Sequence, residues 1–135
     1  MRSIARRRVA SATGVFLGAL LLILLGVRSA TAHAIVLESI PARDAVLDRS
    51  PSRVVLRFNS KIEKRLSRVT LGVAGGTPVA TPIADAGAAG DEAPDRIVVP
   101  LRPLPPGAYV LRYKVLSADG HITEGALRFT VTAGH

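Results

Sequence analysis

The sequence predicts an all-β sandwich with about seven strands. Short segments rich in β-branched residues recur after residue 32, and Pro, Gly and Asp separate them at intervals of about ten residues. No stretch in that part of the chain shows the periodicity of an amphipathic helix. A mature chain of about 100 residues is long enough to enclose one small hydrophobic core.

The first 32 residues resemble a secretory signal peptide. Arg6-Arg7-Arg8 form a positive start, residues 15–27 form an uncharged apolar run, and Ala30-Thr31-Ala32 is a typical cleavage motif. Because the run is shorter than the ~20 residues that span a bilayer, we expect cleavage after Ala32 rather than a membrane anchor. The predicted organisation is therefore a signal peptide over 1–32 and a β-sandwich domain over 33–135. We expect the product to be periplasmic or secreted, without stable membrane insertion.

The first half of the mature chain contains two predicted strands. Residues 33–39 form the first strand, and a turn follows at Pro41 and Asp44. Residues 53–58 alternate between apolar and other side chains, so that one face carries Val54, Leu56 and Phe58. The polar and basic stretch over 59–66 predicts a loop or a single helical turn.

The second half contains five further predicted strands. They cover residues 68–73, 77–83, 96–101, 108–116 and 126–132, and Ala74-Gly75-Gly76 joins the first two as a hairpin. The small and acidic residues 84–95 predict a surface loop. Alternation predicts inward-facing side chains on the last two strands: Tyr109, Leu111, Tyr113, Val115, Leu127, Phe129 and Val131.

The net charge of +8 does not indicate a nucleic-acid-binding protein. Residues 1–32 hold five of the 18 basic residues and no acid, which leaves 13 basic and 10 acidic residues in the mature chain. These charges are mostly scattered, whereas nucleic-acid binding needs a dense basic face. Aromatic residues make up only 4% of the chain, so a stacking platform for bases is not expected either.

The absence of sulfur limits the metals that the mature chain could bind. The chain has no Cys, and its one Met is Met1. Any metal site must therefore use nitrogen and oxygen ligands, which suit Cu(II) or Zn and are poor ligands for Cu(I).

Asp119-Gly120-His121 is a candidate metal-binding turn, and His33 is its candidate partner. Cleavage after Ala32 would leave His33 with a free α-amine of pKa ~8, which can chelate a metal together with the imidazole ring. His33, Asp119 and His121 would then supply three nitrogens and one oxygen, the tetragonal set that Cu(II) prefers. Two alternatives stay open: Asp-Gly-His is an ordinary turn, and His33 falls at the cleavage site by chance.

Several segments resemble those of the CopC-type periplasmic copper-resistance proteins. The resemblance covers residues 33–135 and rests on the His-Ala start and on four further segments: 39–45 (SIPARDA), 54–58 (VVLRF), 104–109 (LPPGAY) and 115–121 (VLSADGH). It implies a Greek-key β-sandwich or barrel, immunoglobulin-like or cupredoxin-like. It also implies one Cu(II) ion held by the amine and ring of His33, by Asp119 and by His121.

Two departures from the family pattern refine this expectation. Some members have a Met-rich Cu(I) segment, which this chain lacks, so the match is to the Cu(II)-only type. Some members also have an acidic residue near the copper, where this chain has Ser60. Whether an acidic residue near Ser60 or Glu63 assists the site stays open.

The leading functional hypothesis is a non-enzymatic Cu(II) carrier or buffer outside the cytoplasm, for copper resistance, homeostasis or import. The resemblance implies a CopD-like inner-membrane copper importer as a partner. Two alternatives stay open: a copper oxidative enzyme with a histidine brace, and a metal-free structural β-sandwich module. The small size of the domain, its few aromatics and the carboxylate beside His121 weigh against the oxidative enzyme.

Overall fold

The computed structural model describes residues 33–84 and 93–134. The predicted signal peptide and its cleavage site lie outside these residues, as does most of the loop predicted over 84–95. All described residues belong to one compact unit. Within the described part of the chain, no helix is long and apolar enough to cross a membrane.

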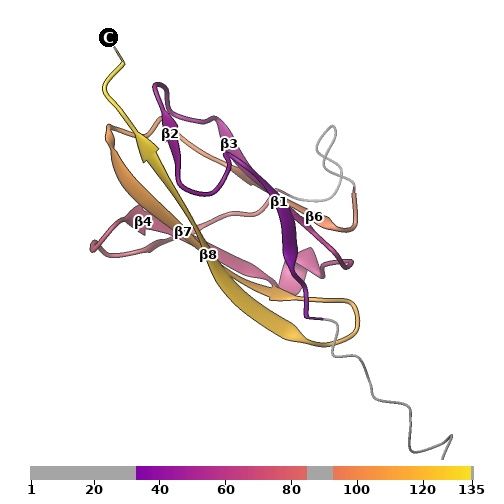
Figure 1. Ribbon diagram of the computed structural model, residues 1–135. Coiled ribbons are helices and arrows are strands. Elements are labelled where there is room, and N and C mark those ends of the chain that lie inside the picture. The colour runs from indigo at the N-terminus through magenta and orange to yellow at the C-terminus, as the bar shows by residue number, and fades with distance from the viewer. Residues whose placement is uncertain (1–32, 85–92, 135) are drawn as a thin grey trace, which may run out of the picture. The chain divides into compact units, whose positions relative to one another are not determined.

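The described residues form eight strands and one short 3-10 helix, which confirms the all-β prediction (Figure 1). One sheet has three strands in the order β1-β3-β6, and the other has five in the order β2-β8-β7-β4-β5. The elements are β1 (Val36–Ile40), β2 (Ala45–Leu47), β3 (Arg53–Phe58), η1 (Lys64–Leu66), β4 (Arg68–Val73), β5 (Val79–Thr81), β6 (Arg96–Pro100), β7 (Gly107–Leu116) and β8 (Ile122–Val131).

The core lies between the two sheets and follows the predicted alternation. Val54, Leu56 and Phe58 of β3 are each at most 1% exposed. They belong to one cluster with buried side chains of the opposite sheet, among them Leu111, Val115, Leu127 and Phe129. Each fully buried side chain of this size contributes about 1.5–3 kcal/mol to folding, so this cluster is the main source of stability.

The structure differs from the predicted strands in two places. Residues 45–47 form β2, which pairs in parallel with the end of β8, whereas the sequence predicted a turn as far as Ala45 and no strand after it. A three-residue edge strand leaves no periodic pattern, and its existence depends on β8. The last strand begins at Ile122 rather than at residue 126. Glu124 and Gly125 interrupt the apolar pattern, but their backbones still pair with β7.

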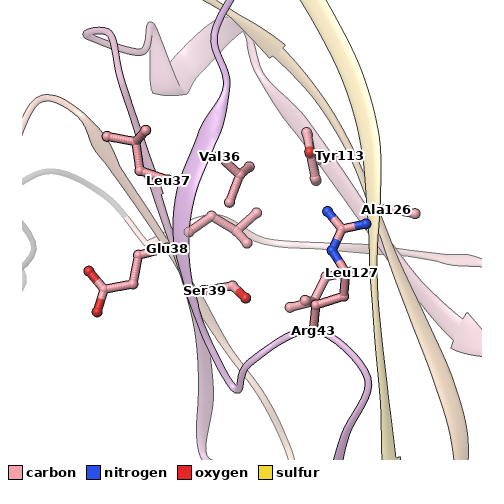
Figure 2. Close-up of a pocket in the computed structure, with 9 residues that line it drawn as sticks. Val36, Leu37, Glu38, Ser39, Arg43, Tyr113, Ala126 and Leu127 are labelled. Atoms are coloured by element: carbon pink, nitrogen blue, oxygen red, sulfur yellow. The ribbon is translucent and has the colours of Figure 1, made fainter.

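The sheets separate beside β1 and leave a hollow of about 180 Å³. Figure 2 shows that the Arg43 side chain extends toward Tyr113 within this hollow, while Glu38 points to the other side of β1. Glu38 forms an ion pair with Arg57 of β3, at 3.1 Å. The hollow is therefore lined by the Arg43 guanidinium and the half-buried Tyr113 phenol, and no residue of the Asp-Gly-His turn lines it.

Candidate metal centre

The Asp-Gly-His sequence forms the turn that joins β7 to β8. The backbone N–H of Ser117 donates to the carbonyl of His121 at 2.9 Å, and the N–H of Gly120 donates back to the carbonyl of Ser117 at 2.9 Å. Gly120 has φ +89°, a left-handed conformation that L side chains rarely adopt. The turn thus brings Asp119 and His121 onto one rigid loop, and the glycine between them makes that conformation possible.

The Asp119 carboxylate is held within its own turn. Its Oδ1 atom accepts a hydrogen bond from the Ser117 hydroxyl and another from the backbone N–H of His121, at 3.2 Å. The hydroxyl first, and then the backbone N–H, lower the pKa of Asp119. The group is therefore an anion at neutral pH, and a metal ion need not displace a proton from it.

His121 faces the other carboxylate oxygen. Its Nδ1 atom lies 3.2 Å from Oδ2 of Asp119, yet this buried nitrogen forms no hydrogen bond within the described structure. The side chain as a whole is 43% exposed. Nδ1 thus points toward the carboxylate without forming a hydrogen bond to it, while the ring as a whole stays accessible to solvent.

The start of the described chain runs beside this turn, as Figure 1 shows for the indigo segment near the β7–β8 hairpin. The rings of His33 and His121 meet edge to face, with centroids 6.0 Å apart and planes at 72°. Ala34 is only 1% exposed and belongs to the core. Burial of Ala34 fixes the backbone next to His33, while the His33 ring stays on the surface.

Asn59 is a site-supporting residue that the sequence did not reveal. Its side-chain Oδ1 accepts the N–H of Ile35 at 2.8 Å, and its own N–H donates to the carbonyl of Ile35 at 3.0 Å. These two bonds tie the chain just after His33 to the end of β3. A polar residue directly after a buried strand was the available signal, but many surface loops share it.

Ser117 and the segment before η1 support the other half of the site. Ser117 is 1% exposed and forms an isolated bridge with Ile62. The N–H of Ala118 donates to the carbonyl of Lys61 at 2.9 Å, and the N–H of Glu63 donates to Leu116 at 2.8 Å. The turn is therefore held from outside as well as by its own hydrogen bonds.

Of the three predicted ligands, His33 lies beside His121, and His121 lies beside Asp119. Within residues 33–84 and 93–134, however, no group of three or more His, Cys, Asp or Glu side chains is arranged around one point as in a metal site. Neither Ser60 nor Glu63 forms a side-chain hydrogen bond or ion pair with these three residues; the Ser60 hydroxyl bonds only to the Lys61 carbonyl, at 3.3 Å. The side chains alone thus provide an incomplete set of metal ligands.

The donor atoms that are present fit a small divalent ion. Two ligand atoms that each lie about 2 Å from one metal, at right angles, stand about 3 Å apart. The 3.2 Å between Nδ1 of His121 and Oδ2 of Asp119 matches that spacing. Nδ1 of His121, which forms no hydrogen bond with a described residue, is the nitrogen that such an ion would contact.

Comparison with known proteins gives consistent matches over the whole sandwich. A family model described as the CopC domain matches residues 36–132. Copper resistance protein C of Escherichia coli is 28% identical over 107 residues, which are 76% of this chain and 84% of that protein. The crystal structure of CopC from Methylosinus trichosporium OB3b is 31% identical, covers 74% of this chain and 94% of its own, and has a TM-score of 0.65. PcoC of Escherichia coli, a methionine-rich copper resistance protein, is 28% identical, covers 75% and 100%, and has a TM-score of 0.59.

Proposed function

Because this chain belongs to the CopC family of copper-resistance proteins, we propose that it binds one Cu(II) ion outside the cytoplasm, as a carrier or buffer. The contact between the His33 and His121 rings is the observation that carries this proposal. Two histidines far apart in sequence meet at the surface, beside a carboxylate with a lowered pKa. A purely structural module gives no reason for this grouping.

The α-amine of His33 completes the ligand set in this proposal. Cleavage after Ala32 would release that amine beside the His33 ring, and the His121 ring and the Asp119 carboxylate would add a third nitrogen and an oxygen. The amine is not a side chain, which explains why the side chains alone fall short of a metal site. Three nitrogens and one oxygen suit the tetragonal preference of Cu(II).

The chemistry of the site favours binding and release over catalysis. The chain has no Cys and no Met after Met1, so the soft ligands that Cu(I) needs are missing. Asp119 would take a coordination position that oxygen activation needs open. The side chains of His121 and Asp119 are 43% and 37% exposed, so the ion can exchange with a second protein or with solvent.

The signal-like N-terminal sequence supports a periplasmic or secreted location. Arg6-Arg7-Arg8, the apolar run and Ala30-Thr31-Ala32 have the order of an export signal. Export and the metal site depend on each other in this proposal, because the same cleavage creates the chelating amine. A CopD-like membrane importer is the proposed acceptor in a route of copper import.

Electron paramagnetic resonance during a Cu(II) titration tests the proposal. The protein beginning at His33 is compared with a version that carries one extra Ala ahead of His33. We expect one tight equivalent with several nitrogen couplings in the first protein, and a weaker or reshaped spectrum in the second. His33→Ala and His121→Ala should each remove nitrogen couplings.

Equal and weak copper binding by both versions would overturn the proposal. It would leave the cleavage site without a chemical role and favour the metal-free module. Reductant-dependent oxygen consumption by the copper-loaded protein would instead favour the oxidative enzyme. Both versions keep Ala34 and the core, so a difference between them reports on the amine and not on folding.

A further inference from the structure

The outer face of the five-stranded sheet, on the side away from the core, has an excess of positive charge. Alternation places Arg68 of β4, Arg112 and Lys114 of β7, and Arg128 of β8 on this face, and all four are exposed. Glu124 is the one acidic residue among the described positions of the same three strands. We call Arg68, Arg112, Lys114 and Arg128 the basic face.

Most of the cations on the basic face form no ion pair with a described residue. Lys114 forms an ion pair with Glu124 at 2.8 Å, whereas the side chains of Arg68 and Arg112 form no hydrogen bond or ion pair with any described residue. Arg68 also lies directly across from Lys114 in the β4–β7 pairing, and like charges in that position destabilise a sheet. Folding does not require these cations, because none of them belongs to the core.

Three of the four cations line a hollow. A depression of about 520 Å³ is lined by Arg68, Arg112 and Lys114, and small residues such as Thr70 and Ala126 leave room between them. Glu124, which pairs with Lys114, is the one acidic residue among the described residues that line it. Carboxylate side chains from an extended chain could enter such a depression and reach guanidinium groups on either side. A flat lipid surface would not use it, because its headgroups meet only the tips of the cations.

We propose that the basic face docks an acidic, extended segment of a partner protein. The charges and the hollow carry this inference independently of any metal. The strands of the face lead directly into the Asp-Gly-His turn: Lys114 of β7 lies three residues before Ser117, and Glu124 of β8 lies three residues after His121. If the proposed copper function holds, a partner bound here stands next to the ion that it receives.

Fluorescence anisotropy with a labelled octa-glutamate peptide tests the docking surface on metal-free protein in a chelator. Arg68→Gln/Arg112→Gln should weaken binding about fivefold or more, since exposed charge pairs each add a modest attraction. The matched control is Arg53→Gln/Arg102→Gln, which removes two other exposed arginines and should change binding less than about twofold. Glu124→Gln frees Lys114 and should strengthen binding, a gain that misfolding cannot imitate.

Three results would overturn the proposal: equal loss in both double variants, no gain with Glu124→Gln, or no binding of octa-glutamate by the native protein at about 50 mM salt. Vesicles of phosphatidylcholine and phosphatidylglycerol provide the competing arm. If the basic-face variant loses vesicle binding but keeps peptide binding, the face serves a membrane and the proposal fails. Because the anisotropy experiment contains no copper, a negative result in it contradicts the docking proposal and leaves the outcome of the copper titration unaffected.

Discussion

Asn59 and Ile35 form two hydrogen bonds with each other, from side chain to backbone at 2.8 Å and from backbone to backbone at 3.0 Å. This pair joins the first described residues to the end of β3. It therefore determines where His33 stands relative to His121. The copper proposal depends on this placement, because a chelating amine on a loose terminus would seldom meet the His121 ring.

Asn59→Ala should weaken Cu(II) binding by the protein that begins at His33. Loss of a residue that orients a ligand typically costs about tenfold in metal affinity, and the lost hydrogen bond lowers the free energy of unfolding by about 1 kcal/mol. A competition titration against a chromophoric chelator measures the first effect, and urea unfolding measures the second. Asn59→Asp keeps the acceptor oxygen and should bind at least as well as the native protein. Unchanged affinity in Asn59→Ala would show that the burial of Ala34 and the remaining backbone bond between residues 59 and 35 are sufficient to position His33.

Ser117→Ala should raise the pKa of Asp119 toward its ordinary value. The Ser117 hydroxyl is the largest cause of the lowered pKa, and the substitution removes it while the backbone N–H of His121 remains. Carbon NMR of the Asp119 carboxyl during an acid titration of metal-free protein measures the shift. Ser60→Ala removes an exposed hydroxyl that bonds only locally, and it should leave the titration unchanged.

The lowered pKa of Asp119 also predicts how the stability of the protein depends on pH. A lowered folded-state pKa means that Asp119 contributes its stability above the unfolded-state pKa of about 4, and that this contribution is lost as pH falls through the folded value. Ser117→Ala should therefore lose less stability on acidification than the native protein does. If the urea midpoints of both proteins changed by the same amount between neutral and acidic pH, this assignment would be wrong.

Gly125→Ala should destabilise the hairpin of β7 and β8. Tyr113 lies directly across from Gly125, and a Cβ added at Gly125 would overlap the Tyr113 hydroxyl and ring. Overpacking of this kind costs about 1–3 kcal/mol, which urea unfolding can measure. Gly107→Ala is the matched control, because its Cβ would meet Tyr109 at an ordinary 3.6 Å. If Gly125→Ala/Tyr113→Leu is no more stable than Gly125→Ala, the ring is not the obstacle.

Alkaline pH should destabilise the protein through Tyr113. Burial raises the pKa of Tyr113, and the nearby Arg43 works in the opposite direction with a smaller effect. A raised folded-state pKa means that full stability holds below the unfolded-state pKa of about 10 and declines as pH rises through the folded value. Urea unfolding at increasing alkaline pH, with phenolate absorbance alongside, should show this decline in the native protein and a smaller one in Tyr113→Phe.

Tyr109→Phe separates a hydrogen-bond effect from the ionisation effect. The Tyr109 hydroxyl donates to the carbonyl of Pro105 at 2.6 Å, so its loss should lower stability at neutral pH by about 1 kcal/mol. The Tyr113 hydroxyl forms no hydrogen bond with a described residue, so Tyr113→Phe should change the stability little at neutral pH. Equal effects of both substitutions at neutral pH would contradict this distinction.

Alternation in the sequence was sufficient to predict the all-β core. Val54, Leu56 and Phe58 alternate with other residues, and the pleat of a strand turns such a pattern directly into an inward and an outward face. The lack of Cys and the single Met likewise determined the available ligand chemistry, because composition does not depend on folding. The candidate ligands His33, Asp119 and His121 were identified from the cleavage motif, from the Asp-Gly-His turn and from the resemblance to the CopC family.

Only the tertiary structure decided which of these groups meet. The contact between the His33 and His121 rings depends on the burial of Ala34 and on the bonds of Asn59, which join segments distant in sequence. The short strand β2 and the cross-strand contact of Tyr113 with Gly125 depend in the same way on strand pairing. Local patterns determine which face a side chain occupies, but long-range pairing and packing determine its neighbours.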